Sequence, residues 1–289
     1  MITPPINRVD TPHDVVQACS TVWVRLWNWI QTLPPILTLV GMLVFVVAYD
    51  GGVRGALLAW ALAHAITALF ALAATRHVWA PFALDELVDV ALARLAITMG
   101  AVQVVNLISY RIELFILDRY RGIGAVGVYS ISMQAAEAIW LVAAAIATSV
   151  TAPAVQEDEP GARRLIARSA LRGLVYTAVL AAVVGITAPL LIPALFGHDF
   201  RHAARPLAFL LPGIVAYAPV SILVVYLSVR RGRPRLSLAV AVVGLIVTAT
   251  ASVVLIPKHG AGGAALSSTI GYVAGGTMAW IFFRRLARR

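Results

Sequence analysis

The sequence predicts an all-α integral membrane protein, and its composition and its hydropathy pattern are the reasons. Of its 289 residues, 61% are hydrophobic and only 12% are charged, whereas soluble domains carry about 25% charged residues. The apolar residues form runs too long for the ~10-residue strands of a membrane barrel. In lipid, a helix satisfies its own backbone groups. We therefore expect a bundle of about eight transmembrane helices plus an N-terminal amphipathic helix.

The first 33 residues are predicted to be a tail followed by an amphipathic, interfacial helix. Residues 1–17 lack the apolar core of a secretory signal. Within 15–31, Trp23, Trp27 and Ile30 share one helical face, and paired tryptophans suit the membrane interface. Pro34–Pro35 is expected to break the helical path, because proline removes a backbone donor. Whether residues 15–31 lie on the membrane or cross it stays open.

Eight long apolar runs follow, and each is long enough to cross a membrane, which needs about 20 residues per helix. We divide them into two helices within 34–80 and six within 81–289. Runs longer than 20 residues are expected to tilt. The runs are 34–49, 55–74, 90–117, 123–150, 168–195, 205–229, 236–256 and 262–283.

The loop charges predict the orientation. The side that bears the C-terminus holds 13 of the 23 basic residues and the other side holds 6. Basic loops favour the cytoplasm, so we expect a multi-pass protein of the cytoplasmic (inner) membrane with a cytoplasmic C-terminus. Membrane topology also accounts for the net charge of +10, so we predict the lipid bilayer, and not nucleic acid, as the partner.

Polar residues in the third and fourth runs are the candidate site. Arg111 and Glu113 lie late in the third run, and Glu137 lies in the middle of the fourth. Consecutive helices joined by a short turn pack antiparallel, so Arg111 is predicted to meet Glu137. The neighbouring amides extend this polar stripe: Gln103, Asn106 and Gln134. Two interpretations stay open: a hydrated site for an anionic headgroup with Arg111 as its phosphate ligand, or an ion pair that fixes helix register.

The sequence predicts neither an enzyme nor a cofactor or metal site. It contains no GxSxG, HExxH or Walker motif and no paired aspartate cluster. The single Cys19 excludes a disulfide framework. His198, Asp199 and His202 are interpreted as a solvated turn, because two histidines and one aspartate at flexible spacing make a poor metal site.

Several stretches resemble a known family, the polysaccharide or O-antigen flippases of the multidrug/oligosaccharidyl-lipid/polysaccharide exporter superfamily. Residues 110–113 and 136–140 resemble the seventh and eighth helices of such flippases. The stretch from 195 to 213 resembles the segment that joins the ninth and tenth. Residues 232–234 and 255–265 resemble the eleventh helix and the turn into the twelfth. Their order across about 180 residues makes the match specific.

The resemblance implies one complete six-helix lobe from about residue 90 onward and the last two helices of the other lobe. Members of this family move a polyprenyl-pyrophosphate-linked oligosaccharide to the outer leaflet by alternating access, so that lipid is the implied substrate. Other envelope-polysaccharide assembly proteins are implied partners. About four helices of the family pattern are missing, so we expect this chain alone to transport poorly or not at all. The cavity role carries over to Arg111, Glu113 and Glu137, with weaker support for Gln103, Asn106 and Gln134.

Two other functions remain open from the sequence. One is a cation-coupled multidrug antiporter of the same superfamily, in which the acidic residues couple ion movement to efflux. The other is a non-transporting membrane subunit.

Overall fold

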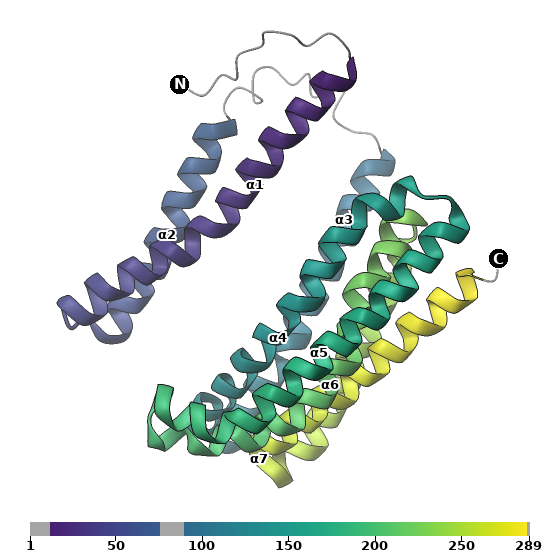
Figure 1. The fold of residues 1–289 in the computed structure, drawn as a ribbon. Coiled ribbons are helices and arrows are strands. Elements are labelled where there is room, and N and C mark those ends of the chain that lie inside the picture. The colour runs from purple at the N-terminus through teal and green to yellow at the C-terminus, as the bar shows by residue number, and fades with distance from the viewer. Residues whose placement is uncertain (1–11, 76–89, 288–289) are drawn as a thin grey trace. The chain divides into compact units, whose positions relative to one another are not determined.

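The computed structural model describes residues 12–75 and 90–287, and these two ranges are helical with short connections and contain no strand (Figure 1). The chain divides into two compact units, Met1–Val88 and Asp89–Arg289, which are described separately. The boundary at 80/81 expected from the sequence lies outside the described residues.

The first unit is a helical hairpin. It contains α1 (Pro12–Met42), which a π-helical turn (Leu43–Ala48) extends, and α2 (Gly52–Thr75). Small residues recur every fourth position on the buried face of α2, and this spacing lets two helices approach closely. A Cβ on Gly41 of α1 would lie only 2.9 Å from the Cβ of Ala59. The small buried residues are Gly55, Ala59, Ala63 and Thr67.

The expected break at Pro34–Pro35 is wrong, because α1 runs through both prolines to Met42. Each proline removes one backbone donor, but a membrane helix tolerates this loss where nearby hydroxyl groups and neighbouring helices satisfy the freed carbonyls. Thr32 lies beside the two prolines, but its hydroxyl donates to the carbonyl of Asn28 at 2.7 Å and not to the carbonyls of Ile30 and Gln31, which the prolines leave without their usual donor. The amphipathic segment 15–31 is therefore the first part of a longer helix; the side chains of Trp23 and Trp27 lie outside the described residues.

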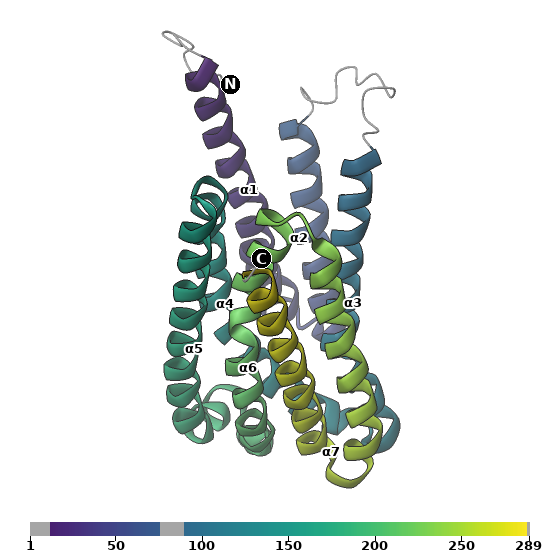
Figure 2. The ribbon, with the colours of Figure 1, turned by 90° about the vertical axis from the view of Figure 1, so that its right-hand side faces the viewer.

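The second unit is an up-and-down bundle of long helices joined by short turns (Figures 1 and 2). A 3-10 turn (His198–Ala203) precedes α6, and a π-helical turn (Val225–Arg230) extends it. The helices are α3 (Val90–Arg121), α4 (Ile123–Gln156), α5 (Glu159–Phe196), α6 (Ala204–Val224) and α7 (Pro234–Ala287).

Helix α7 is a hairpin of two membrane-length helices. Its 54 residues would span about 80 Å if straight, far more than the ~30 Å hydrocarbon core. The backbone reverses at Gly260, whose φ of 56° and ψ of −132° are not helical. A Cβ on Gly271 would collide with Thr248, so the two halves pack tightly against each other.

The predicted all-α membrane fold is therefore confirmed. Within the described ranges, seven helices are long and apolar enough to cross a membrane, and the last of them folds into two passes. Their outward faces carry large apolar side chains, and a surface of this kind suits lipid better than water. Examples are Ile186 (80% exposed), Leu190 (76%) and Phe115 (73%).

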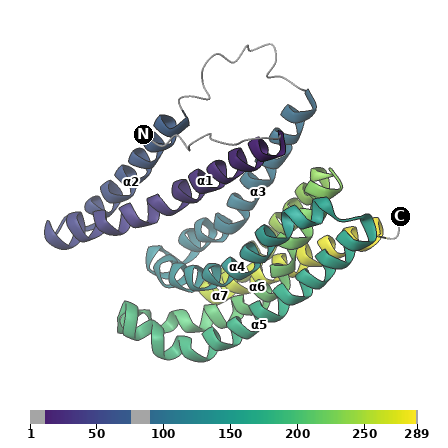
Figure 3. The same cartoon turned by 45° about the horizontal axis from the view of Figure 1, so that its top comes forward.

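The connections place the turns of the second unit at two ends. Gly122, Gly197 and Gly260 lie at one end, which we call the distal end, and each has a positive φ (77°, 95° and 56°) that favours glycine. The opposite end holds the α4–α5 connection, the connection into α7 and the last turn of α7 (Figure 3). Each end gathers a different set of charged residues.

Candidate functional site

The central feature of the candidate site is an ion pair between α3 and α4. Arg111 Nη1 lies 3.6 Å from Glu137 Oε1, and their side chains are 44% and 31% exposed. The meeting of these two residues, predicted from their places on consecutive helices, is seen in the structure. Because both side chains remain partly exposed, the pair faces outward from the second unit rather than into its core.

The predicted amides lie along the same two helices. Gln103 and Gln134 are exposed and Asn106 is half-buried. Gln103 lies two turns before Arg111 on α3, and Gln134 lies one turn before Glu137 on α4, so each residue shares a helix face with its charged neighbour. We call Gln103, Arg111, Gln134 and Glu137 the polar stripe. Asn106 lies five residues before Arg111 and seven before Glu113, so it belongs to the Glu113 side of α3. An exposed stripe of this kind at membrane depth is costly unless it faces water or another polar surface.

Glu113 is separated from the polar stripe. It lies two residues after Arg111, which places it on the other side of α3, and it is 1% exposed. Its Oε1 accepts hydrogen bonds from Ser268 Oγ at 2.6 Å and from the Tyr129 hydroxyl at 3.1 Å. Its Oε2 is buried without a hydrogen-bond partner. The sequence interpretation grouped Glu113 with the other cavity residues, whereas the structure places it inside the bundle.

Four aromatic side chains from different helices pack near this region. Tyr110 and Trp140 have ring centroids 5.0 Å apart, and Trp140 lies 5.3 Å from Tyr272. Tyr217 lies 5.3 Å from Tyr272 in turn. The rings come from α3, α4, α6 and α7, so they fix the relative positions of the helices that carry the stripe and Glu113.

Sequence reasoning missed these aromatic residues and the two hydroxyl partners of Glu113. Tyr129 and Ser268 are 139 positions apart, and no local pattern joins residues at that separation. Both residues lie within apolar runs next to other hydroxyl residues, Ser130 beside Tyr129 and Ser267 and Thr269 beside Ser268, so the sequence did not single them out. Only the path of α7 brings them to one carboxyl group.

The His198, Asp199 and His202 group lies in the 3-10 turn before α6. There, Arg201 Nε donates to His202 Nε2 at 3.3 Å. Among the residues that the structure describes, no group of three or more His, Cys, Asp or Glu side chains could hold a metal ion.

Comparison of this fold with solved structures finds similar transporters. One is a crystal structure of the Vibrio cholerae MATE transporter VcmN in the bent form, with a TM-score of 0.63 and 16% identity, covering 91% of this chain. Another is a crystal structure of a MATE protein in complex with MaL6, with a TM-score of 0.67 and 16% identity, covering 90% of this chain. The chain therefore has a MATE-like fold.

The chain spans 62% of the length of each of these solved proteins. No family model matches the sequence, and no curated protein matches it. The similarity thus concerns the fold.

Proposed function

We propose that the chain acts in a membrane transporter that moves a polyprenyl-pyrophosphate-linked oligosaccharide across the cytoplasmic membrane by alternating access. The second unit supplies one lobe, and its polar stripe lines the substrate path. The C-terminus lies in the cytoplasm. The observation that carries the proposal is the outward-facing Arg111–Glu137 pair on a bundle whose other outward faces are strongly apolar.

The geometry of the pair suits exchange with an anionic substrate. Arginine carries five N–H donors, and the 3.6 Å separation from Glu137 exceeds a strong charge-assisted hydrogen bond of about 2.7–2.9 Å. A pyrophosphate offers several charged oxygens that bind a guanidinium in a bidentate manner. Gln103 and Gln134 are exposed on the same helices, and their amides can hydrogen-bond sugar hydroxyl groups.

The proposal assigns a different role to each chemical part of the substrate. Arg111 compensates the pyrophosphate charge where the membrane would otherwise exclude it. The polyprenyl chain stays in lipid beside the exposed apolar faces of the helices. Rocking of this lobe against a second one then opens the path to either side in turn.

Binding to the purified full chain tests this role without requiring transport. The probe is a fluorescent polyprenyl-pyrophosphate disaccharide in dodecyl maltoside micelles. Arg111→Ala should weaken binding by about 10- to 100-fold, because a hydrogen bond to a charged group contributes about 1.5–3 kcal/mol. Arg284→Ala is the matched control, because Arg284 is an exposed arginine at the end of α7, and it should leave the affinity unchanged.

Two outcomes of this binding experiment would contradict the proposal. One is an equal loss of affinity in both variants, which would indicate nonspecific charge attraction. The other is an unchanged affinity for Arg111→Ala, which would leave the ion pair with a structural role only.

A cation-coupled multidrug antiporter is the second candidate function, and the surroundings of Glu113 favour it. The Glu113 carboxyl group is buried, its Oε2 has no partner, and two hydroxyl groups surround its Oε1. Such a group is suited to taking up a proton or a small cation during transport. Resistance to ethidium conferred on a drug-sensitive host, with efflux driven by a sodium or proton gradient, would support this candidate over the flippase.

A further inference from the structure

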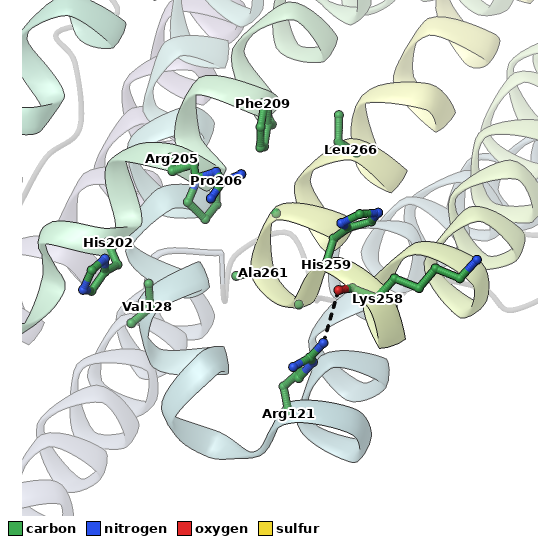
Figure 4. Close-up of a pocket in the computed structure, with 12 residues that line it drawn as sticks. Arg121, Val128, His202, Arg205, Pro206, Phe209, Lys258, His259, Ala261 and Leu266 are labelled. Atoms are coloured by element: carbon green, nitrogen blue, oxygen red, sulfur yellow. Dashed lines mark hydrogen bonds between the residues drawn. The ribbon is translucent and has the colours of Figure 1, made fainter.

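A basic cavity opens at the distal end of the second unit, away from the polar stripe. Its volume is about 680 Å³, within the range of small-ligand sites, which is roughly 300–1,000 Å³. It lies between the 3-10 turn before α6, the start of α6 and the turn at Gly260 (Figure 4). We call it the distal cavity.

Five basic or imidazole side chains line the distal cavity, and none of its lining residues is acidic. Figure 4 shows Arg205 and His259 on facing sides, Arg121 beneath the α7 turn, and Lys258 extending sideways from that turn. A lysine ammonium on its flexible stem can reorient toward a ligand. The remaining member of the five is His202.

Within the described ranges, no carboxylate forms an ion pair with the cations of the distal cavity. The three ion pairs found among the described residues join Arg111, Arg230 and Arg231 to glutamates, and none includes Arg121, Arg205 or Lys258. Arg121 instead donates to the carbonyl of Pro257 at 2.7 Å. Three like charges around one cavity repel each other, so a bound anion would stabilise this arrangement.

Two arginines at the opposite end of the same unit, Arg230 and Arg231, show the contrasting arrangement. There, Arg231 Nη2 lies 2.9 Å from Glu159 Oε1, and Arg230 Nε lies 3.6 Å from Glu159 Oε2. Arg230 also donates to the carbonyl of Val155 at 2.9 Å. Arg230 and Arg231 thus have a carboxylate partner, whereas no carboxylate in the described part of the chain forms an ion pair with Arg121 or Arg205.

The remaining lining is apolar, which indicates the kind of anion. Phe209 lies under the guanidinium of Arg205, with 5.9 Å between the carbon of that group and the ring centroid. Pro206, Val128 and Leu266 complete the apolar wall. A free inorganic anion gains nothing from such a wall, whereas a phosphate with a hydrocarbon chain attached contacts both parts. We propose that the distal cavity binds the phosphate group of an anionic lipid.

Each part of the cavity has a defined role in this proposal. Arg205 hydrogen-bonds the phosphate oxygens, and Lys258 and His259 contact them from the α7 turn. Arg121 holds that turn in place through the Pro257 carbonyl. A helix begins after the turn at Gly260, and the partial positive charge of its N-terminal end also favours an anion.

The test uses the purified full chain in dodecyl maltoside micelles and phosphatidylglycerol labelled on its acyl chain. Binding is followed by fluorescence anisotropy, with unlabelled phosphatidylcholine and sodium pyrophosphate as competitors. We expect the double variant Arg205→Gln and Lys258→Gln to weaken binding at least tenfold. The matched control, Arg284→Gln and Arg285→Gln, removes two charges at the opposite end and should change binding less than threefold.

A second variant separates loss of the site from loss of folding. Arg205→Lys with Lys258→Arg keeps both charges and should retain affinity within about threefold, since the attraction is mainly electrostatic. An equal loss of phosphatidylglycerol affinity in the distal-cavity double variant and in the control double variant would overturn the proposal. Competition by pyrophosphate as strong as that by phosphatidylglycerol would also overturn it, because the ligand would then be a free anion. Phosphatidylcholine should compete at least tenfold more weakly.

Discussion

Glu113 and Glu137 lie on adjacent helices of the same unit, yet their surroundings differ in kind. Glu137 is 31% exposed and lies beside the arginine of the polar stripe. Glu113 is 1% exposed and is held by two hydroxyl groups. A carboxyl group paired on an outward face is free to exchange its partner, whereas one fixed inside a bundle supports the packing of several helices. The comparison therefore separates the proposed binding surface from a carboxyl group that anchors helix packing.

The largest expected effect is on the free energy of unfolding. It should be larger for the buried carboxyl group than for the exposed one. Glu113→Ala should destabilise the chain by about 2–3 kcal/mol, because it removes two hydrogen bonds, each contributing about 1–1.5 kcal/mol. Glu137→Ala should cost less than about 1 kcal/mol, the usual range for an exposed ion pair. Unfolding in dodecyl maltoside titrated with dodecyl sulfate measures both. Equal losses of unfolding free energy in the two variants would show that burial does not distinguish the two carboxyl groups.

A smaller effect is expected at the Tyr129 hydroxyl. Tyr129→Phe removes one hydrogen bond to Glu113 while keeping the ring that fills the core. We expect a loss of about 1 kcal/mol in the same unfolding measurement. Tyr176→Phe is the control, because Tyr176 is 56% exposed on the outward face of α5, and its change should be near zero. If Tyr129→Phe left the free energy of unfolding unchanged, the Tyr129 hydrogen bond would not contribute to holding Glu113.

The smallest expected effect is a gain of affinity at the polar stripe. Glu137→Gln removes the carboxylate that competes with an anionic ligand for Arg111. An exposed pair contributes about 0.2–1 kcal/mol, so binding of the polyprenyl-pyrophosphate disaccharide should tighten by about 1.5- to 5-fold. Stability should change by less than about 1 kcal/mol. Weaker binding would show that Glu137 orients Arg111 instead of competing for it.

The sequence determined the fold class, the eight apolar passes and the meeting of Arg111 with Glu137. A long apolar run predicts a membrane-crossing helix directly. A short turn makes two consecutive helices pack side by side. The same reasoning was wrong at Pro34–Pro35, where local propensity predicted a break that the helix does not have. Propensities measured in water overstate the cost of proline in a membrane helix.

Only the tertiary structure decided where each polar group ends up. Helical periodicity turns Glu113 away from Arg111, but the packing of α7 against α3 brings Ser268 close enough to donate a hydrogen bond to the Glu113 carboxyl group. The distal cavity also depends on three turns distant in sequence, which meet because the helices between them have similar length. Contacts across more than a hundred residues leave no local pattern, since they arise from packing the whole bundle.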